Sequence, residues 1–144
     1  MNYDFKQTNF SRCLLAGLLA GFTAAVLDLI LLFCFGSSDI GSEYSFIINP
    51  FTLFFGAIIP AVVAGLFYSF LSQMKRGNII HIIIFSVLTF LFAKESLQIN
   101  RMEDQNVERL FHQLFMSMII LTGSFATFLV PIITQNKKLQ QALF

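Results

Sequence analysis

Four long apolar segments, separated by polar connections, are the feature that most limits how this chain can fold. They cover residues 13–35, 50–71, 79–93 and 110–133 of the 144 in the chain. A helix needs about 20 apolar residues to cross the ~30 Å hydrocarbon core of a bilayer, and all but the third segment are that long. None of them alternates with the period of two that is typical of a membrane β-strand. We predict one all-α domain, residues 1–144, built as a bundle of four transmembrane helices.

The composition supports a membrane protein. Hydrophobic residues make up 56% of the chain and charged residues 12%, whereas a soluble domain carries about 25% charged residues. A soluble domain of this size has too little interior to bury so much apolar surface. The formal net charge of +1 creates no basic field that would attract nucleic acid. The expected partner is therefore the lipid bilayer, and no nucleic acid is expected.

Lysine and arginine are unevenly divided between the two sides of a four-span topology. These residues are enriched on the cytoplasmic side of membrane proteins. Six lie on the side of the two termini and three on the other: Lys6, Arg12, Lys75, Arg76, Lys137 and Lys138 against Lys94, Arg101 and Arg109. We predict an antiparallel, multi-pass bundle in the cell membrane with both termini in the cytoplasm. The first segment is longer than the apolar core of a signal peptide, which has about 7–15 residues, so we expect it to stay uncleaved.

Asp28 is the one acidic residue inside the four apolar segments. Gly17, Gly21, Ala24 and Asp28 are spaced by four, three and four residues, so they share a stripe along one face of the first helix. Small residues in membrane helices mark the places where two helices approach closely. We predict that Asp28 faces a neighbouring helix rather than lipid.

The second segment has a matching surface of small residues. Three of them recur at four-residue spacing, with Pro60 beside them: Ala57, Ala61 and Gly65. Pro60 has no N–H to offer the carbonyl of Gly56, four residues earlier. Asp28 and Gly56 are expected at a similar depth, so we predict that a protonated Asp28 donates a hydrogen bond to this carbonyl.

Polar residues also gather toward the outer ends of the segments. The candidates for an outward-facing pocket shared with Asp28 are Thr52, Thr89, His112, Gln113 and Ser117. Ionisable residues inside a membrane are costly, and a functional role is their default explanation. The alternative is that Asp28 is protonated, because burial disfavours the charged form, and that it bridges two helices. For His112 the alternative is an interfacial histidine in contact with water. His81, near the cytoplasmic end of the third segment, is expected to be interfacial.

No catalytic motif stands out. The patterns H-E-x-x-H and C-x-x-C and a phosphate-binding glycine loop are absent from the sequence. Two histidines on different segments are too few for four-coordinate zinc. Cys13 and Cys34 would lie roughly 30 Å apart on one helix, beyond the reach of a disulfide. We expect no enzyme, metal or cofactor and interpret both cysteines as small apolar residues; lipidation of Cys13 and an intermolecular bridge through Cys34 stay open.

Two stretches carry a family resemblance: "RCLLAGLLAGFTAAVLDLIL" at 12–31 and "FLVPII" at 128–133. An arginine before a Gly/Ala-rich helix, with a polar residue in the outer third of that helix, resembles the opening of small uncharacterised bacterial four-helix membrane proteins of a domain-of-unknown-function type. The resemblance implies a four-helix fold in a bacterial inner membrane. It implies no activity, because none is established for that family.

Two classes of function fit these observations. The first is a structural or accessory membrane component, either a homo-oligomer or a subunit of a larger membrane complex, because small-residue faces on two helices suit assembly. The second is a small transporter or channel that uses Asp28 as a proton or cation site. A closed, dry environment around Asp28 favours the first class, and a pocket that opens outward and includes His112 favours the second.

Overall fold

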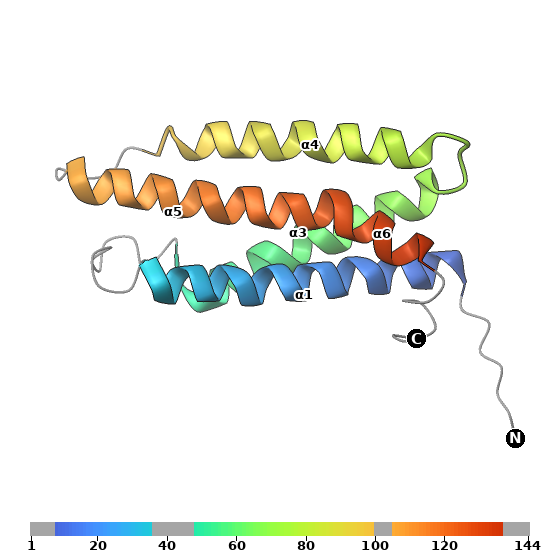
Figure 1. Cartoon of the computed structure of the whole chain (residues 1–144), viewed down its shortest axis with the longest axis horizontal. Helices are drawn as coiled ribbons and strands as arrows, with labels where there is room; N and C mark the ends of the chain where they lie inside the picture. The colour runs from blue at the N-terminus through green and yellow to red at the C-terminus, as the bar shows by residue number, and fades with distance from the viewer. Residues whose placement is uncertain (1–7, 36–47, 100–104, 137–144) are drawn as a thin grey trace, which may run out of the picture.

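The structure, a computed structural model, describes residues 8–35, 48–99 and 105–136. They form α1 (Asn9–Phe35), α3 (Pro50–Leu71), α4 (Gly77–Ser96) and α5 (Gln105–Ser124), which continues through the π-helix η1 (Phe125–Leu129) into α6 (Val130–Gln135). No strand occurs in these ranges. Figure 1 shows the helices lying along the long axis of the molecule, with α1 against α3 and α4 against α5. The all-α prediction is confirmed.

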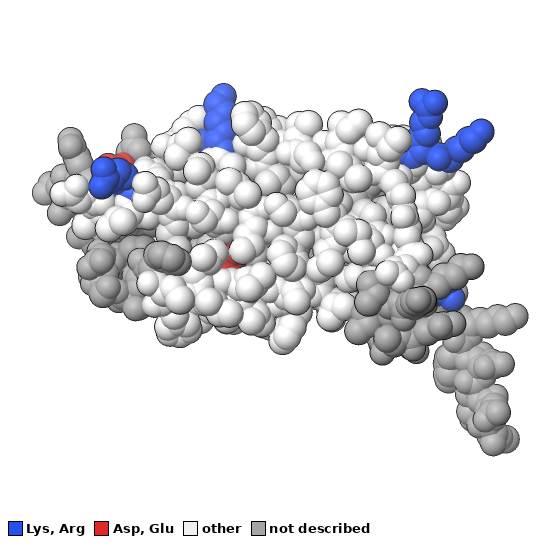
Figure 2. Space-filling model, viewed as in Figure 1, with Lys and Arg blue, Asp and Glu red and all other residues white. Residues whose placement is uncertain are grey.

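Four helices are long and apolar enough to cross a membrane: Asn9–Cys34, Pro50–Leu71, Gly77–Ser96 and Asn106–Gln135. The four predicted spans are therefore confirmed as helices, and the fold is consistent with a multi-pass membrane protein. The short third segment becomes a helix of 20 residues that takes in Lys94. In Figure 2, most basic side chains lie toward the two ends of the long axis, one stands on the upper edge between the left end and the middle, and the rest of this surface is almost uncharged.

The first and second spans are held together by their small residues. Ala24, Ala57 and Ala61 are at most 1% exposed. A Cβ added to Gly17 would lie 2.5 Å from the carbonyl oxygen of Ala61, and one added to Gly21 would lie 2.7 Å from the Cα of Ile58. The backbones of α1 and α3 therefore touch where the predicted stripe runs. Close packing is the main attraction between helices in lipid, which is as apolar as the side chains.

Two glycines of α3 offer a matched test of this contact. A Cβ on Gly65 would run into the backbone carbonyl of Cys13, whereas a Cβ on Gly56 meets no atom within 4 Å. We expect Gly65→Ala to lower the thermal midpoint in detergent, because overpacking costs about 1–3 kcal/mol. Gly56→Ala should leave it unchanged or raise it, because alanine is the better helix former. Equal midpoints for the two variants would contradict the close approach of α1 and α3.

A hydrogen-bond network joins four helices at one end of the bundle. The side-chain amide of Asn9, at the start of α1, donates to Ser72 Oγ just after α3 at 2.9 Å. The Tyr68 hydroxyl donates to the side chain of Asn78 on α4 and accepts from Gln135 of α6 at 3.0 Å. Tyr68 is 2% exposed. The polar ends of the helices are therefore fixed to one another around one buried tyrosine.

The fourth span changes its hydrogen-bond register within the apolar region. In a π-helix each N–H pairs with the carbonyl five residues earlier. The residue five positions after Ala126 is Pro131, which has no N–H. His81 Nε2 lies 3.1 Å from the Ala126 oxygen, and since a carbonyl only accepts, Nε2 carries the proton. His81 of α4 therefore supplies the N–H that Pro131 cannot offer to the Ala126 carbonyl.

The position of His81 corrects a prediction. We expected an interfacial histidine, and the structure places its side chain at 0% exposure. Its ring centroid lies 5.0 Å from that of Tyr68 and 4.5 Å from that of Phe85. His81 is buried because the unpaired carbonyl of Ala126 gives it a partner inside the bundle.

Candidate functional site

Asp28 is buried on α1 between α3 and α5, with 2% of its surface exposed. The hydroxyl of Thr122 on α5 donates to Asp28 Oδ2 at 2.8 Å. The other carboxyl oxygen, Oδ1, has no hydrogen-bond partner among the described residues. A buried polar atom without a partner is rare in folded proteins and calls for an explanation.

The partner of Asp28 differs from the one predicted. We expected the carbonyl of Gly56, and the structure gives Thr122. Gly56 lies on an exposed face of α3 with open space beside its Cα. Pro60 is on the same exposed face and not in the contact with α1. The sequence signal for Thr122 was its place in a run of small and polar residues near the middle of the fourth span, Thr122, Gly123 and Ala126.

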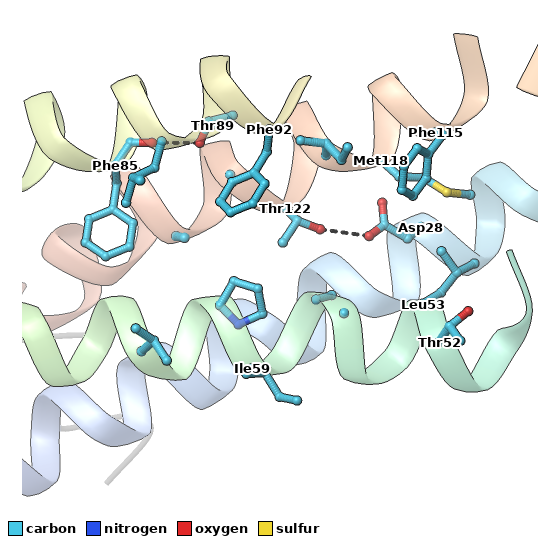
Figure 3. Close-up of a pocket in the computed structure, with 18 residues that line it drawn as sticks. Asp28, Thr52, Leu53, Ile59, Phe85, Thr89, Phe92, Phe115, Met118 and Thr122 are labelled. Carbon is cyan, nitrogen blue, oxygen red and sulfur yellow. Dashed lines mark hydrogen bonds between the residues drawn. The ribbon is translucent and has the colours of Figure 1, made fainter. Parts of the chain in front are cut away.

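A cavity of about 460 Å³ lies beside this carboxyl, between α3 and α4, with α5 as its floor. We call it the α3–α4 groove. Most of its lining is apolar, contributed by Leu53, Ile59, Val63, Phe85, Leu88, Phe92, Phe115, Met118 and Ile119. The polar side chains that line it are Asp28, Thr52, Thr89 and Thr122 (Figure 3). The α3–α4 groove is therefore mainly apolar, and Asp28 is the one carboxyl group that the described residues place in its wall.

The groove exists because α4 separates from α3 over part of its length. No residue of α4 between Phe85 and Ala93 is buried. Ile59 on α3 and Phe92 on α4 are 57% and 63% exposed while lining the cavity. The groove therefore opens between α3 and α4, on a face that these apolar helices would turn toward lipid.

Three of the six predicted pocket residues line the groove: Asp28, Thr52 and Thr89. Thr52 also caps α3, because its N–H donates to the Asn49 side chain at 2.9 Å and its hydroxyl accepts from the Asn49 N–H at 3.1 Å. Thr89 donates to the Phe85 carbonyl of its own helix at 2.7 Å. These two threonines support local helix structure at the wall of the groove.

The other three predicted residues do not line the groove. His112 Nδ1 lies 2.9 Å from the Ser96 carbonyl oxygen, and its Nε2 lies 3.6 Å from Glu108 Oε1. Ser117 donates to the carbonyl of Gln113 one turn earlier at 2.7 Å, and both residues are exposed. The prediction that all six residues share one pocket is therefore wrong for His112, Gln113 and Ser117. The imidazole of His112 joins α5 to α4.

The chemistry available in the groove is that of one carboxyl and a neighbouring hydroxyl. In the described part of the chain, no three His, Cys, Asp or Glu side chains gather in a way that could hold a metal ion. No second titratable side chain among the described residues lines the groove. Such a site can hold a proton or pair with a cation.

Comparisons with protein-family models, with curated proteins and with solved structures found no match. The resemblance of residues 12–31 to small four-helix membrane proteins stays a prediction. The observations in this chain that bear on function are the polar contacts between its helices and the α3–α4 groove beside the unpaired Asp28 Oδ1.

Proposed function

We propose that the chain is an antiparallel, multi-pass protein of the cell membrane, in a bacterial inner membrane, with both termini in the cytoplasm. The distribution of lysine and arginine supports this orientation, with six on the side of the termini and three on the other. The apolar middle and charged ends of the surface support a transmembrane position (Figure 2).

Cysteine labelling from outside intact cells tests the orientation. In a background with Cys13 and Cys34 replaced by alanine, we expect an impermeant maleimide to label Ser42→Cys and Asn106→Cys. It should not label Lys75→Cys, which is exposed but predicted to be cytoplasmic. Gly77 is unsuitable as the inner position, because a Cβ there would collide with the carbonyl of Leu71. Labelling at position 75 without permeabilisation would overturn the orientation.

Within that membrane we propose a structural or accessory role, as a homo-oligomer or as a subunit of a larger complex. The observation that carries this proposal is that polar side chains of the spans are used to hold helices together. Asp28 pairs with Thr122, His81 with the Ala126 carbonyl, and His112 with the Ser96 carbonyl. Under this proposal the chain has no catalytic activity, cofactor or metal.

The mass of the native particle tests the accessory role. The protein is extracted with its surrounding lipid into polymer nanodiscs. We expect each particle to contain a protein mass of at least two chains of 16.3 kDa. Two differently tagged copies expressed together distinguish a homo-oligomer, in which one tag recovers the other, from a complex with other chains. A protein mass of one chain in nanodiscs would contradict the proposal.

A second candidate is a small transporter or channel that uses Asp28 as its proton or cation site. One observation favours it: the carboxyl lies in the wall of the α3–α4 groove and has one oxygen without a partner. A purely structural carboxyl would be expected to use both oxygens. Flux that depends on Asp28 separates this candidate from the accessory role.

A further inference from the structure

We propose that the α3–α4 groove binds an organic monocation with a bulky apolar body, and that the cationic centre of this ligand pairs with Asp28. The proposal rests on the second candidate function and names the class of ligand. Asp28, Thr122 and the lining of the groove carry it.

The charge of the ligand follows from the surroundings of Asp28. A carboxylate in an apolar setting is costly unless a charge or hydrogen bonds compensate it. Thr122 compensates Oδ2 at 2.8 Å, and Oδ1 is left without a partner. A cation placed beside Oδ1 would compensate its charge, whereas an anion or a neutral ligand without a hydrogen-bond donor would not.

The lining of the groove limits the ligand to a single positive charge. Among the described residues, Asp28 is the only acidic side chain in the lining, so a dication would keep one charge unpaired. No lysine, arginine or histidine within residues 8–35, 48–99 and 105–136 lines the groove, so a phosphate or carboxylate on the ligand would find no cationic partner there. These features argue against a phospholipid or a zwitterion as the ligand.

The size and surface of the groove define the rest of the ligand. Its volume of about 460 Å³ lies within the roughly 300–1,000 Å³ typical of small-molecule sites. The rings of Phe85, Phe92 and Phe115 line it, and aromatic faces attract cations. The ligand is therefore an apolar, largely aromatic or aliphatic body that surrounds a diffuse positive charge.

Oδ1 is buried, so a ligand can reach it only after its surroundings rearrange. Oδ1 is shielded in the structure, and Phe115 and Met118 lie beside Asp28 in Figure 3. Met118 is unbranched and has three rotatable side-chain bonds, so it can adapt its shape to an incoming ligand. The ligand enters between α3 and α4, where the groove opens past Ile59 and Phe92.

Two ions of the same shape and opposite charge test the proposal: tetraphenylphosphonium, a cation, and tetraphenylborate, an anion. Binding to the full chain in detergent is measured by equilibrium dialysis. We expect the wild type to bind the cation in preference to the anion. Asp28→Asn should weaken binding of the cation by about thirtyfold or more, the usual effect of removing one member of a buried charge pair. Its thermal midpoint should stay near that of the wild type.

A second variant tests the place of binding without changing the charge. Gly56→Leu puts a side chain into open space in the groove, because a Cβ there meets no atom within 4 Å. It should weaken binding of the cation as well. Val87→Leu adds bulk to the exposed face of α4 outside the groove and should leave binding unchanged.

Four results would overturn the proposal. Equal binding of both ions, or binding that survives Asp28→Asn, would show a general apolar groove such as an acyl-chain site. Loss of binding in Val87→Leu as large as in Gly56→Leu would remove the groove as the place of binding. No binding of the cation to folded wild type would reject this ligand class, while Asp28-dependent flux of protons or inorganic cations would still support the transporter candidate.

Discussion

Replacing His81 by phenylalanine is expected to lower the thermal midpoint of the detergent-solubilised protein by about 5 °C. Phenylalanine fills much of the same space between Tyr68 and Phe85 but has no N–H for the Ala126 carbonyl. This carbonyl cannot pair with residue 131 in the π-helical register, because that residue is proline. A buried carbonyl that loses its partner costs about 1–3 kcal/mol.

A double-mutant cycle identifies the cause of this loss. Pro131→Ala restores an N–H five residues after Ala126, so the His81→Phe change should cost less in that background. Pro60→Ala is the matched control, because Pro60 also lies inside a helix but on an exposed face of α3, whereas His81 is fully buried. We expect the full cost of His81→Phe to persist in the Pro60→Ala background. The same cost in all three backgrounds would mean that His81 acts by packing and not through its hydrogen bond.

The sequence alone was sufficient to predict the four helices and the small-residue surface that joins the first two spans. Length and hydropathy define a transmembrane helix because the bilayer leaves few other ways to satisfy the backbone. The stripe from Gly17 to Asp28 was visible because helical periodicity is a local property of one segment. The partner stripe on α3, Ala57 and Ala61, was visible for the same reason.

Contacts between distant spans could not be predicted in the same way. The bond from His81 to Ala126 depends on a π-helical register in another span. The partner of Asp28 depends on which helix lies against the end of the small-residue stripe, and this helix is α5. The α3–α4 groove results from the separation of two whole helices, which no short pattern in either of them encodes.

Asp28→Asn is expected to leave the protein folded and assembled and to abolish any proton or organic-cation flux that the wild type supports in proteoliposomes. The amide oxygen can accept the hydrogen bond from Thr122 as the carboxyl oxygen does at 2.8 Å. An amide cannot release a proton near neutral pH and cannot neutralise a bound cation. Structure and transport should therefore respond differently to this one change.

Thr122→Val is the control, because it removes the hydrogen bond to Asp28 and keeps the carboxyl, whereas Asp28→Asn does the reverse. It removes the hydroxyl that holds Oδ2 but keeps the carboxyl in the wall of the groove. If Asp28 is the coupling site, this variant keeps measurable flux, because the titratable group remains. Flux that survives Asp28→Asn would exclude Asp28 as the coupling residue. If folded wild-type protein carries neither protons nor organic cations, the carboxyl serves the fold through Thr122, and the accessory role is the function that its geometry supports.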